Sequence, residues 1–211
     1  MKYKEFKKFA KEFPLFSSTY LSFLNESVYS LRNQLRRWEK EGLLIKLRKG
    51  LYILNEEDRK FTPSKVFIAN QLYSPSYIST EYALGFYDLI PEKVVDVTSV
   101  TTRKTYKITN VFGTFIYQHI KKEAFSGFVS LKDENGFPFL IALPEKAVVD
   151  FFYLNLENFT EKDVEIFKEG YRFQNLEMIS PENIVKFANL FNCKKLLKVV
   201  ENFLRVREEL K

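Results

Sequence analysis

The chain has 211 residues, of which 45% are hydrophobic and 28% are charged, and its formal net charge is +6. This length allows one large domain or two small ones, with a core that needs no disulfide or metal for stability. The one cysteine, Cys193, excludes an internal disulfide and fits a reducing compartment. The sequence lacks a signal peptide and any run of about 18 apolar residues, which predicts a soluble, cytoplasmic protein with no membrane partner.

Positive charge is concentrated near the N-terminus. Residues 1–55 contain twelve Lys and Arg against five Glu, a net charge of +7, which leaves −1 on residues 56–211. A local excess of this kind favours attraction to the phosphates of a nucleic acid. The ordinary alternative is that these cations form the solvated face of an amphipathic helix.

Residues 2–13 predict a basic amphipathic helix that ends at Pro14. Its apolar residues recur at helical spacing and are Tyr3, Phe6, Phe9, Ala10 and Phe13. Such a helix can lie on an anionic membrane, but we expect its apolar face to pack against the helix that follows. Ser17 or Ser18 is expected to cap a second helix that continues through Leu24.

Residues 25–54 predict a longer helix followed by a hairpin. The helix carries one apolar stripe, formed by Val28, Leu31, Leu35 and Trp38. Asn25 or Ser27 is expected to cap its start, and Gly42 to end it. Residues 44–47 and 51–54 read as short strands, joined at Arg48-Lys49-Gly50, where Gly50 allows the positive φ of a tight turn.

A helix with a cationic outer face, followed by a hairpin that carries cations at its tip, is typical of a winged helix-turn-helix. We therefore expect double-stranded operator DNA as a partner. Candidate contacts near the groove floor are Ser27, Tyr29, Ser30 and Asn33, because an Asn side chain can pair with adenine. Candidate contacts to phosphates or groove walls are Arg36, Arg37 and Lys40. The expected wing contacts are Lys46, Arg48 and Lys49.

The polar segment 55–60 predicts a boundary between a DNA-binding domain at residues 1–55 and an α+β domain at residues 61–211. In the second domain, residues 63–73 and 80–87 predict helices, with Ser79 as a cap and Tyr82, Ala83 and Phe86 inward. Residues 94–101, 105–109 and 112–120 predict neighbouring strands of an antiparallel sheet. A hairpin around Asn135-Gly136 follows, and the chain is expected to be helical from about residue 144 onward.

The sequence offers little support for catalysis, metal binding or a cofactor. The one histidine, His119, has no nucleophile motif beside it, and a structural role is favoured. Asp96, Glu145 and Lys146 match no catalytic spacing, and the last two read as the opening of a helix after Pro144. We therefore expect no enzymatic activity.

Four segments of the second domain resemble AbiEi-type antitoxins, which are predicted transcriptional regulators of abortive-infection systems that defend against viruses. They are residues 77–91 (YISTEYALGFYDLIP), 97–105 (VTSVTTRKT), 112–120 (FGTFIYQHI) and 142–150 (ALPEKAVVD). The order of these segments and the wing-like Arg48-Lys-Gly-Leu-Tyr52 also fit that family. One departure is at residues 86–88, where the family usually has an aromatic residue followed by Gly.

The resemblance implies the antitoxin of a type IV toxin–antitoxin pair. Such a protein represses its own operon through the winged helix and counteracts a nucleotidyltransferase-like toxin, commonly without a stable complex. A surface for that second activity is hypothesised at Thr101, Thr102, Arg103 and Lys104, although a strand end with solvated charges is an equal alternative. Two other functions stay open: a one-component regulator that senses a small ligand, and a DNA-targeted nuclease.

Overall fold

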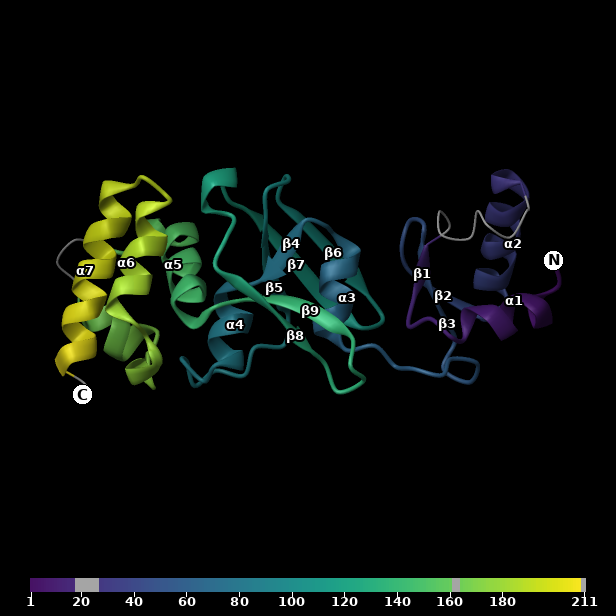
Figure 1. The fold of residues 1–211 in the computed structure, drawn as a ribbon, viewed down its shortest axis with the longest axis horizontal. Helices are drawn as coiled ribbons and strands as arrows, with labels where there is room; N and C mark the ends of the chain where they lie inside the picture. The colour runs from purple at the N-terminus through teal and green to yellow at the C-terminus, as the bar shows by residue number, and fades with distance from the viewer. Residues whose placement is uncertain (18–26, 161–163, 210–211) are drawn as a thin grey trace.

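The computed structural model describes residues 1–17, 27–160 and 164–209, and the fold is of the α+β type. Three parts follow one another along the long axis of the molecule: an N-terminal unit, a central sheet and a group of C-terminal helices (Figure 1). The helix expected from Ser17 or Ser18 to Leu24 lies largely outside the described residues.

The N-terminal unit consists of two helices and a three-stranded antiparallel sheet of order β1-β3-β2. Its elements are α1 (Tyr3–Ala10), β1 (Phe16–Ser17), α2 (Val28–Lys40), β2 (Leu44–Arg48) and β3 (Leu51–Leu54). The first helix is therefore shorter than predicted. Ser17 is not a helix cap, because it lies in β1 opposite Leu51. Ser27 does cap α2, since its Oγ accepts a hydrogen bond from Ser30 N at 3.2 Å.

A small aromatic core joins α1 to α2. The Trp38 side chain is only 1% exposed, and its ring centroid lies 4.8 Å from that of Phe6. Phe6 and Ala10 are fully buried, which confirms that α1 turns its apolar face to the protein. Phe13 is the exception, because it follows the end of α1 and remains 46% exposed.

The hairpin after α2 has the tight turn that Gly50 predicted. Gly50 has a φ of +80°, and Gly42, which follows α2, has a φ of +72°. The turn is tighter than expected, because Arg48 still pairs with Leu51 and only Lys49-Gly50 connects the strands. A bulge between Lys46 and Arg48 adds one residue to β2 and turns the end of the hairpin.

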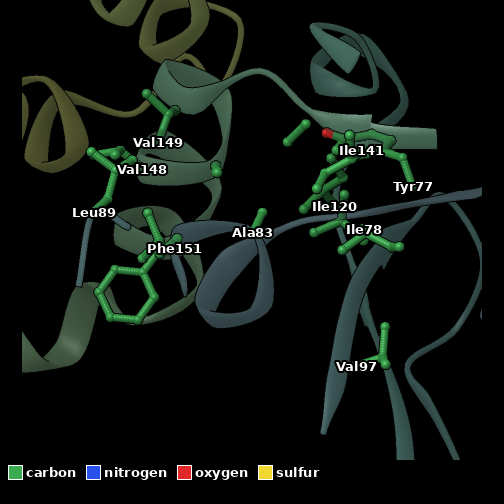
Figure 2. Close-up of a cluster of buried hydrophobic side chains, with 14 of the residues drawn as sticks. Tyr77, Ile78, Ala83, Leu89, Val97, Ile120, Ile141, Val148, Val149 and Phe151 are labelled. Carbon is green, nitrogen blue, oxygen red and sulfur yellow. The ribbon is translucent and has the colours of Figure 1, made fainter. Parts of the chain in front are cut away.

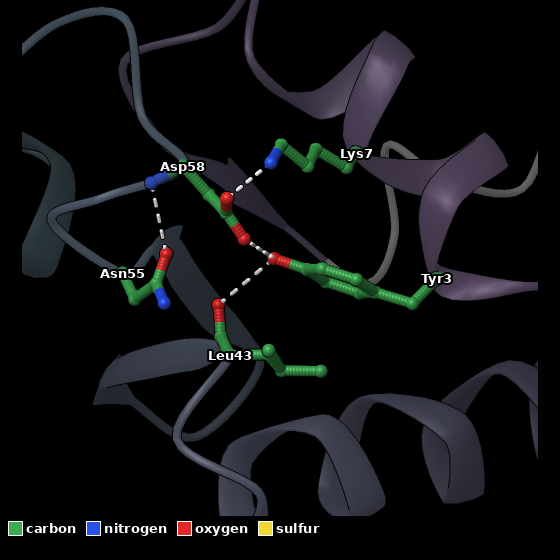
Figure 3. Close-up of polar contacts among 5 residues, drawn as sticks. All are labelled: Tyr3, Lys7, Leu43, Asn55 and Asp58. Carbon is green, nitrogen blue, oxygen red and sulfur yellow. Dashed lines mark hydrogen bonds and ion pairs between the residues drawn. The ribbon is translucent and has the colours of Figure 1, made fainter.

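The segment at residues 55–60 is anchored to α1, as Figure 3 shows. The Asp58 carboxylate accepts hydrogen bonds from Tyr3 Oη, at 2.6 Å, and from Lys7 Nζ, and Asp58 N donates to Asn55 Oδ1 at 3.0 Å. Burial acts to raise the pKa of Asp58, but the hydrogen bonds from Lys7 and Tyr3 and the charge of Lys7 together hold it below its ordinary value.

The central sheet has six strands in the order β6-β7-β5-β4-β9-β8. The strands are β4 (Ser76–Ile78), β5 (Val97–Thr101), β6 (Tyr106–Asn110), β7 (Gly113–His119), β8 (Phe128–Lys132) and β9 (Pro138–Ala142). The sheet is mixed, so the predicted antiparallel sheet is correct only in part: β6 pairs antiparallel with β7 as expected, but β5 runs parallel to β7, and β4 runs parallel to β9. β5 is buried along its whole length and lies inside the sheet between β7 and β4, whereas β6, which exposes Tyr106, forms the edge beside β7.

Helices cover both faces of this sheet. On one face lies α3 (Lys65–Leu72), where the Ala69 carbonyl accepts a hydrogen bond from Tyr117 Oη at 2.6 Å. On the other side, α4 (Thr80–Phe86) and α5 (Pro144–Leu154) share a buried apolar cluster with β4 (Figure 2). Within α4, Ala83 is buried as expected, whereas Phe86 is 46% exposed and the prediction that it faces inward is wrong.

The C-terminal part is helical, as predicted. Helices α6 (Pro181–Asn189) and α7 (Lys194–Glu209) follow α5, and Ser180 caps α6 by accepting a hydrogen bond from Asn183 N at 3.3 Å. Between α5 and α6 lie short helical turns, at Leu156–Asn158, Ile166–Gly170 and Leu176–Met178. Phe152 packs edge-on against Phe203 of α7, so aromatic residues form much of this core.

Two hydrophobic cores meet at the N-terminal sheet. The smaller core lies between that sheet and its helices, whereas Leu15, Leu47, Leu51 and Ile53 belong to the larger core of the central part. Asn110 of β6 reinforces this contact by donating from Nδ2 to the Leu47 carbonyl at 3.3 Å. The division at residues 55–60 therefore marks a change in charge and composition, but apolar packing crosses it. Across the described ranges, every helix is too short or too polar to cross a lipid bilayer.

Candidate nucleic-acid interface

The outer face of α2 is available to a partner because the apolar stripe fixes the rotation of the helix. Leu31, Leu35 and Trp38 are buried, so the residues between them point outward. Tyr29 is 78% exposed, and four further predicted residues are exposed with it: Asn33, Arg36, Arg37 and Lys40.

The two serines predicted to contact bases have other hydrogen-bonding roles in the structure. The Ser27 hydroxyl accepts from the backbone of α2 as its cap, and Ser30 is half-buried, with its Oγ accepting from Gln34 Nε2 at 3.2 Å. Of the four groove-floor candidates, Tyr29 and Asn33 are therefore the ones whose side chains are presented outward.

Cations from the helix and the hairpin meet around one open cavity of about 560 Å³. Arg32 and Arg36 of α2 line one side of it. The other lining residues come from the N-terminal sheet and its turn and are Ser17, Lys46, Arg48, Lys49, Gly50 and Tyr52. Among the described residues no carboxylate lines this cavity, so five positive charges converge on a single concave surface, which we call the basic groove.

Two acidic residues form ion pairs with cations of the N-terminal unit. Glu39 approaches Lys46 at 3.7 Å, and Glu41 approaches Arg37 at 3.7 Å on the same helix. Both are partly exposed ion pairs, of the kind that contributes little to stability. Burial and the charge of Glu39 raise the pKa of Tyr52, while the charges of Arg36 and Arg32 oppose that shift.

The structure thus brings together four predicted contacts in the basic groove: Arg36, Lys46, Arg48 and Lys49. Arg37 and Lys40 share the exposed face of α2 but do not line the groove. Arg32 was missed by the sequence reasoning. Its spacing of four residues before Arg36 could have identified it, because residues four apart lie on the same side of a helix.

The segment hypothesised as a second interaction surface is partly buried. Thr101 has no exposed surface, and its Oγ1 donates to the Pro75 carbonyl at 2.7 Å, so it cannot belong to such a surface. Thr102, Arg103 and Lys104 line a second open cavity, of about 650 Å³, on the central sheet.

The residues considered for catalysis are used in the structure of the fold. Glu145 accepts hydrogen bonds from Ser180 N at 3.0 Å and from Asn183 Nδ2 at 3.4 Å, at the start of α6. His119 Nδ1 lies 2.9 Å from the Arg103 carbonyl oxygen. Among the described residues, no three His, Cys, Asp or Glu side chains gather in a way that could hold a metal ion.

Lys146 forms a buried ion pair with Asp150, and neither side chain is exposed. Asp150 also accepts from Tyr77 Oη at 2.9 Å and from Ser79 Oγ at 2.8 Å. Ser79 stands at the cap position of α4, but its hydroxyl makes this contact and not the predicted cap bond. Residues 77–79 and 142–150, two of the segments quoted for the family resemblance, therefore meet in one buried polar network.

No protein-family model matches this chain, and no curated protein shows significant similarity to it.

Proposed function

We propose that this protein is a DNA-binding transcriptional repressor whose N-terminal unit is a winged helix-turn-helix. The observation that supports this most directly is the basic groove, where Arg32 and Arg36 of the exposed helix and Arg48 of the hairpin converge without a carboxylate among the lining residues that the structure describes. Phosphate attraction of this kind supplies affinity that does not depend on sequence.

In this proposal α2 lies in the major groove of the operator. Tyr29 and Asn33, which are exposed on α2, contact base edges, while the cations of the basic groove neutralise the phosphates beside them. The turn at Lys49-Gly50 reaches the flanking backbone as the wing, and an AT-rich, narrow minor groove would favour insertion of Arg48.

We further propose that the protein acts as the antitoxin of a type IV toxin–antitoxin pair. This part rests on the four segments that resemble AbiEi-type antitoxins, and it places repression of the operon in the N-terminal unit and opposition to a nucleotidyltransferase-like toxin in the remainder. The meeting of residues 77–79 with residues 142–150 around Asp150 supports it, because two of those segments then share one structural role.

DNA binding is tested by fluorescence anisotropy with the duplex that precedes the reading frame of the protein, over a range of salt concentrations. We expect affinity to fall steeply with salt, and Arg36→Ala to lower the slope by about one unit, since each phosphate contact releases about one counterion. Lys132→Ala on the distant strand β8 is the matched control and should leave the slope unchanged. A salt-independent affinity would exclude the proposed interface.

The antitoxin role is tested by the neighbouring reading frame. If it encodes a nucleotidyltransferase-like protein whose expression arrests growth, co-expression of the full chain should restore growth. Normal growth with that neighbour alone, or arrest that the full chain does not relieve, would reject the antitoxin role and leave the repressor proposal standing.

A further inference from the structure

The second cavity, on the central sheet, has the features of a ligand site separate from the basic groove. Its volume of about 650 Å³ falls within the range of about 300–1,000 Å³ that small-molecule sites occupy. The lining consists of a cationic pair, a histidine, two hydroxyls and one aromatic ring: Arg103, Lys104, His119, Thr102, Thr105 and Tyr73. We call this the sheet-end cavity.

The sheet-end cavity lies where two parallel strands end side by side. Strands β5 and β7 run parallel, and Thr101 at the end of β5 lies opposite His119 at the end of β7. In sheets with parallel strands, ligands are commonly bound outside the carboxyl ends of those strands. The position thus favours a binding site independently of the charge of the residues that line it.

The Arg103 side chain is held in place at the sheet-end cavity without an acidic partner among the described residues. The Arg103 guanidinium lies 4.2 Å over the ring of Tyr73 and donates from Nη1 to the Ser74 carbonyl at 3.1 Å. Tyr73 Oη in turn donates to the Lys104 carbonyl at 3.1 Å. Within the described ranges no carboxylate pairs with Arg103 or Lys104, so their charges are available to an anion.

The histidine adds a polar group of defined orientation. Because a carbonyl oxygen only accepts, the 2.9 Å contact between His119 Nδ1 and the Arg103 carbonyl assigns the proton to Nδ1. The same strand end is fixed by a hydrogen bond of 3.2 Å from His119 N to Thr105 Oγ1. The wall of the cavity is therefore pre-organised, which reduces the entropy lost when a ligand binds.

We propose that the sheet-end cavity binds a phosphate-bearing ligand, with the phosphoryl oxygens held by Arg103, Lys104 and the hydroxyl of Thr102. Guanidinium and ammonium groups form charge-assisted hydrogen bonds with phosphate oxygens, and none of the described lining residues is a carboxylate that would repel them. The phosphate comes either from a free nucleotide or from a nucleic-acid backbone. The site lies on the central unit and does not depend on the proposed role of the basic groove.

The test uses the full chain and a matched pair of charge reversals, Lys104→Glu and Lys107→Glu. Both residues are exposed and three positions apart, but only Lys104 lines the cavity. Calorimetry with inorganic pyrophosphate and with ATP should show saturable binding that weakens by about tenfold or more in Lys104→Glu and by less than about twofold in Lys107→Glu. Arg103→Gln should also weaken the binding of pyrophosphate and ATP. The melting temperature of each variant shows whether it still folds.

Two further outcomes assign the source or reject the site. If neither small probe binds, but Lys104→Glu lowers the salt slope of binding to a random duplex by about one unit and Lys107→Glu does not, the phosphate belongs to a nucleic-acid backbone. If the two charge reversals behave alike with pyrophosphate, ATP and the duplex, the sheet-end cavity is not a phosphate site.

Discussion

Single side chains decide how the basic groove is presented. Trp38 packs against two aromatic residues of α1. Its ring centroid lies 5.4 Å from that of Tyr3 and 4.8 Å from that of Phe6. This contact sets the rotation of α2, and the rotation directs Asn33 and Arg36 outward. The core residue and the candidate DNA contacts are therefore coupled through one rigid helix.

Removing the Trp38 ring should destabilise the protein strongly. We expect Trp38→Ala to lower the free energy of unfolding by about 3–5 kcal/mol, because a fully packed aromatic side chain leaves a cavity that the core fills only in part. Urea unfolding followed by circular dichroism measures this. Tyr29→Ala, on the same helix but 78% exposed, should change it by less than about 0.5 kcal/mol. Similar losses in the two variants would contradict the packing described for α2.

Base recognition by Asn33 is the second prediction at the residue scale. Asn33→Ala should relax the preference at one base pair by about 1–3 kcal/mol, since an Asn side chain can make two hydrogen bonds to adenine. Arg37→Ala should instead weaken binding to every sequence alike. A set of operators with single substitutions, measured by competition, separates the two patterns. A uniform loss in Asn33→Ala would remove it from the base contacts.

At the scale of elements, short polar contacts hold the N-terminal unit together. The segment at residues 55–60 has the composition of a linker, but Asp58 binds Tyr3 and Lys7 of α1 and so fixes the chain beside the end of β3. A second contact, between Lys60 Nζ and Glu12 Oε2 at 3.0 Å, also joins this segment to the N-terminal residues. The connection therefore behaves as part of the unit that precedes it.

Stability should depend on pH through Asp58. The pKa of this carboxyl is lower in the folded protein than in the unfolded chain, where it is about 3.9. Its contribution is thus present above about pH 4 and is lost as the pH falls through the folded-state pKa. Asp58→Asn should cost about 1–3 kcal/mol at pH 7 and much less near pH 3, when measured by urea unfolding at both values. The exposed neighbour Glu57, changed to Gln, is the control and should show no such difference.

At the scale of the whole molecule, charge and topology separate two surfaces. The basic groove lies on the N-terminal unit, and the sheet-end cavity lies on the central sheet. Apolar packing of Leu47 and Leu51 into the larger core joins the two parts, so either surface is best tested in the full chain.

The two proposed activities should therefore be separable by surface substitutions. We expect the double variant Arg36→Ala/Arg48→Ala to lose promoter repression in a reporter assay and to retain growth rescue beside the cognate toxin. Both side chains are exposed, so the fold should be preserved. Loss of rescue together with repression, in a variant that still folds, would mean that neutralisation also acts through nucleic-acid binding.

Local features of this protein could be predicted from its sequence. The stripe ending at Trp38 determines α2, Gly50 determines the turn of the first hairpin, and Asn135-Gly136 determines the turn between β8 and β9, where Gly136 has a φ of +80°. The uneven charge identified most of the basic groove. These features depend on periodicity and backbone conformation over a few residues, which the sequence specifies by itself.

Long-range features were decided only by the tertiary structure. The parallel pairing of β5 with β7 joins two strands between which β6 lies in the sequence, and local alternation cannot distinguish it from antiparallel pairing. Ser79 donates to Asp150, 71 residues away, and so makes no cap bond, because an ionised carboxylate in the core needs several donors. Arg32 joins the groove only because the hairpin folds beside it. In each case the deciding contact joins residues that are distant in the chain. Its free energy depends on how deeply those residues are buried in the folded protein, which a local sequence pattern does not specify.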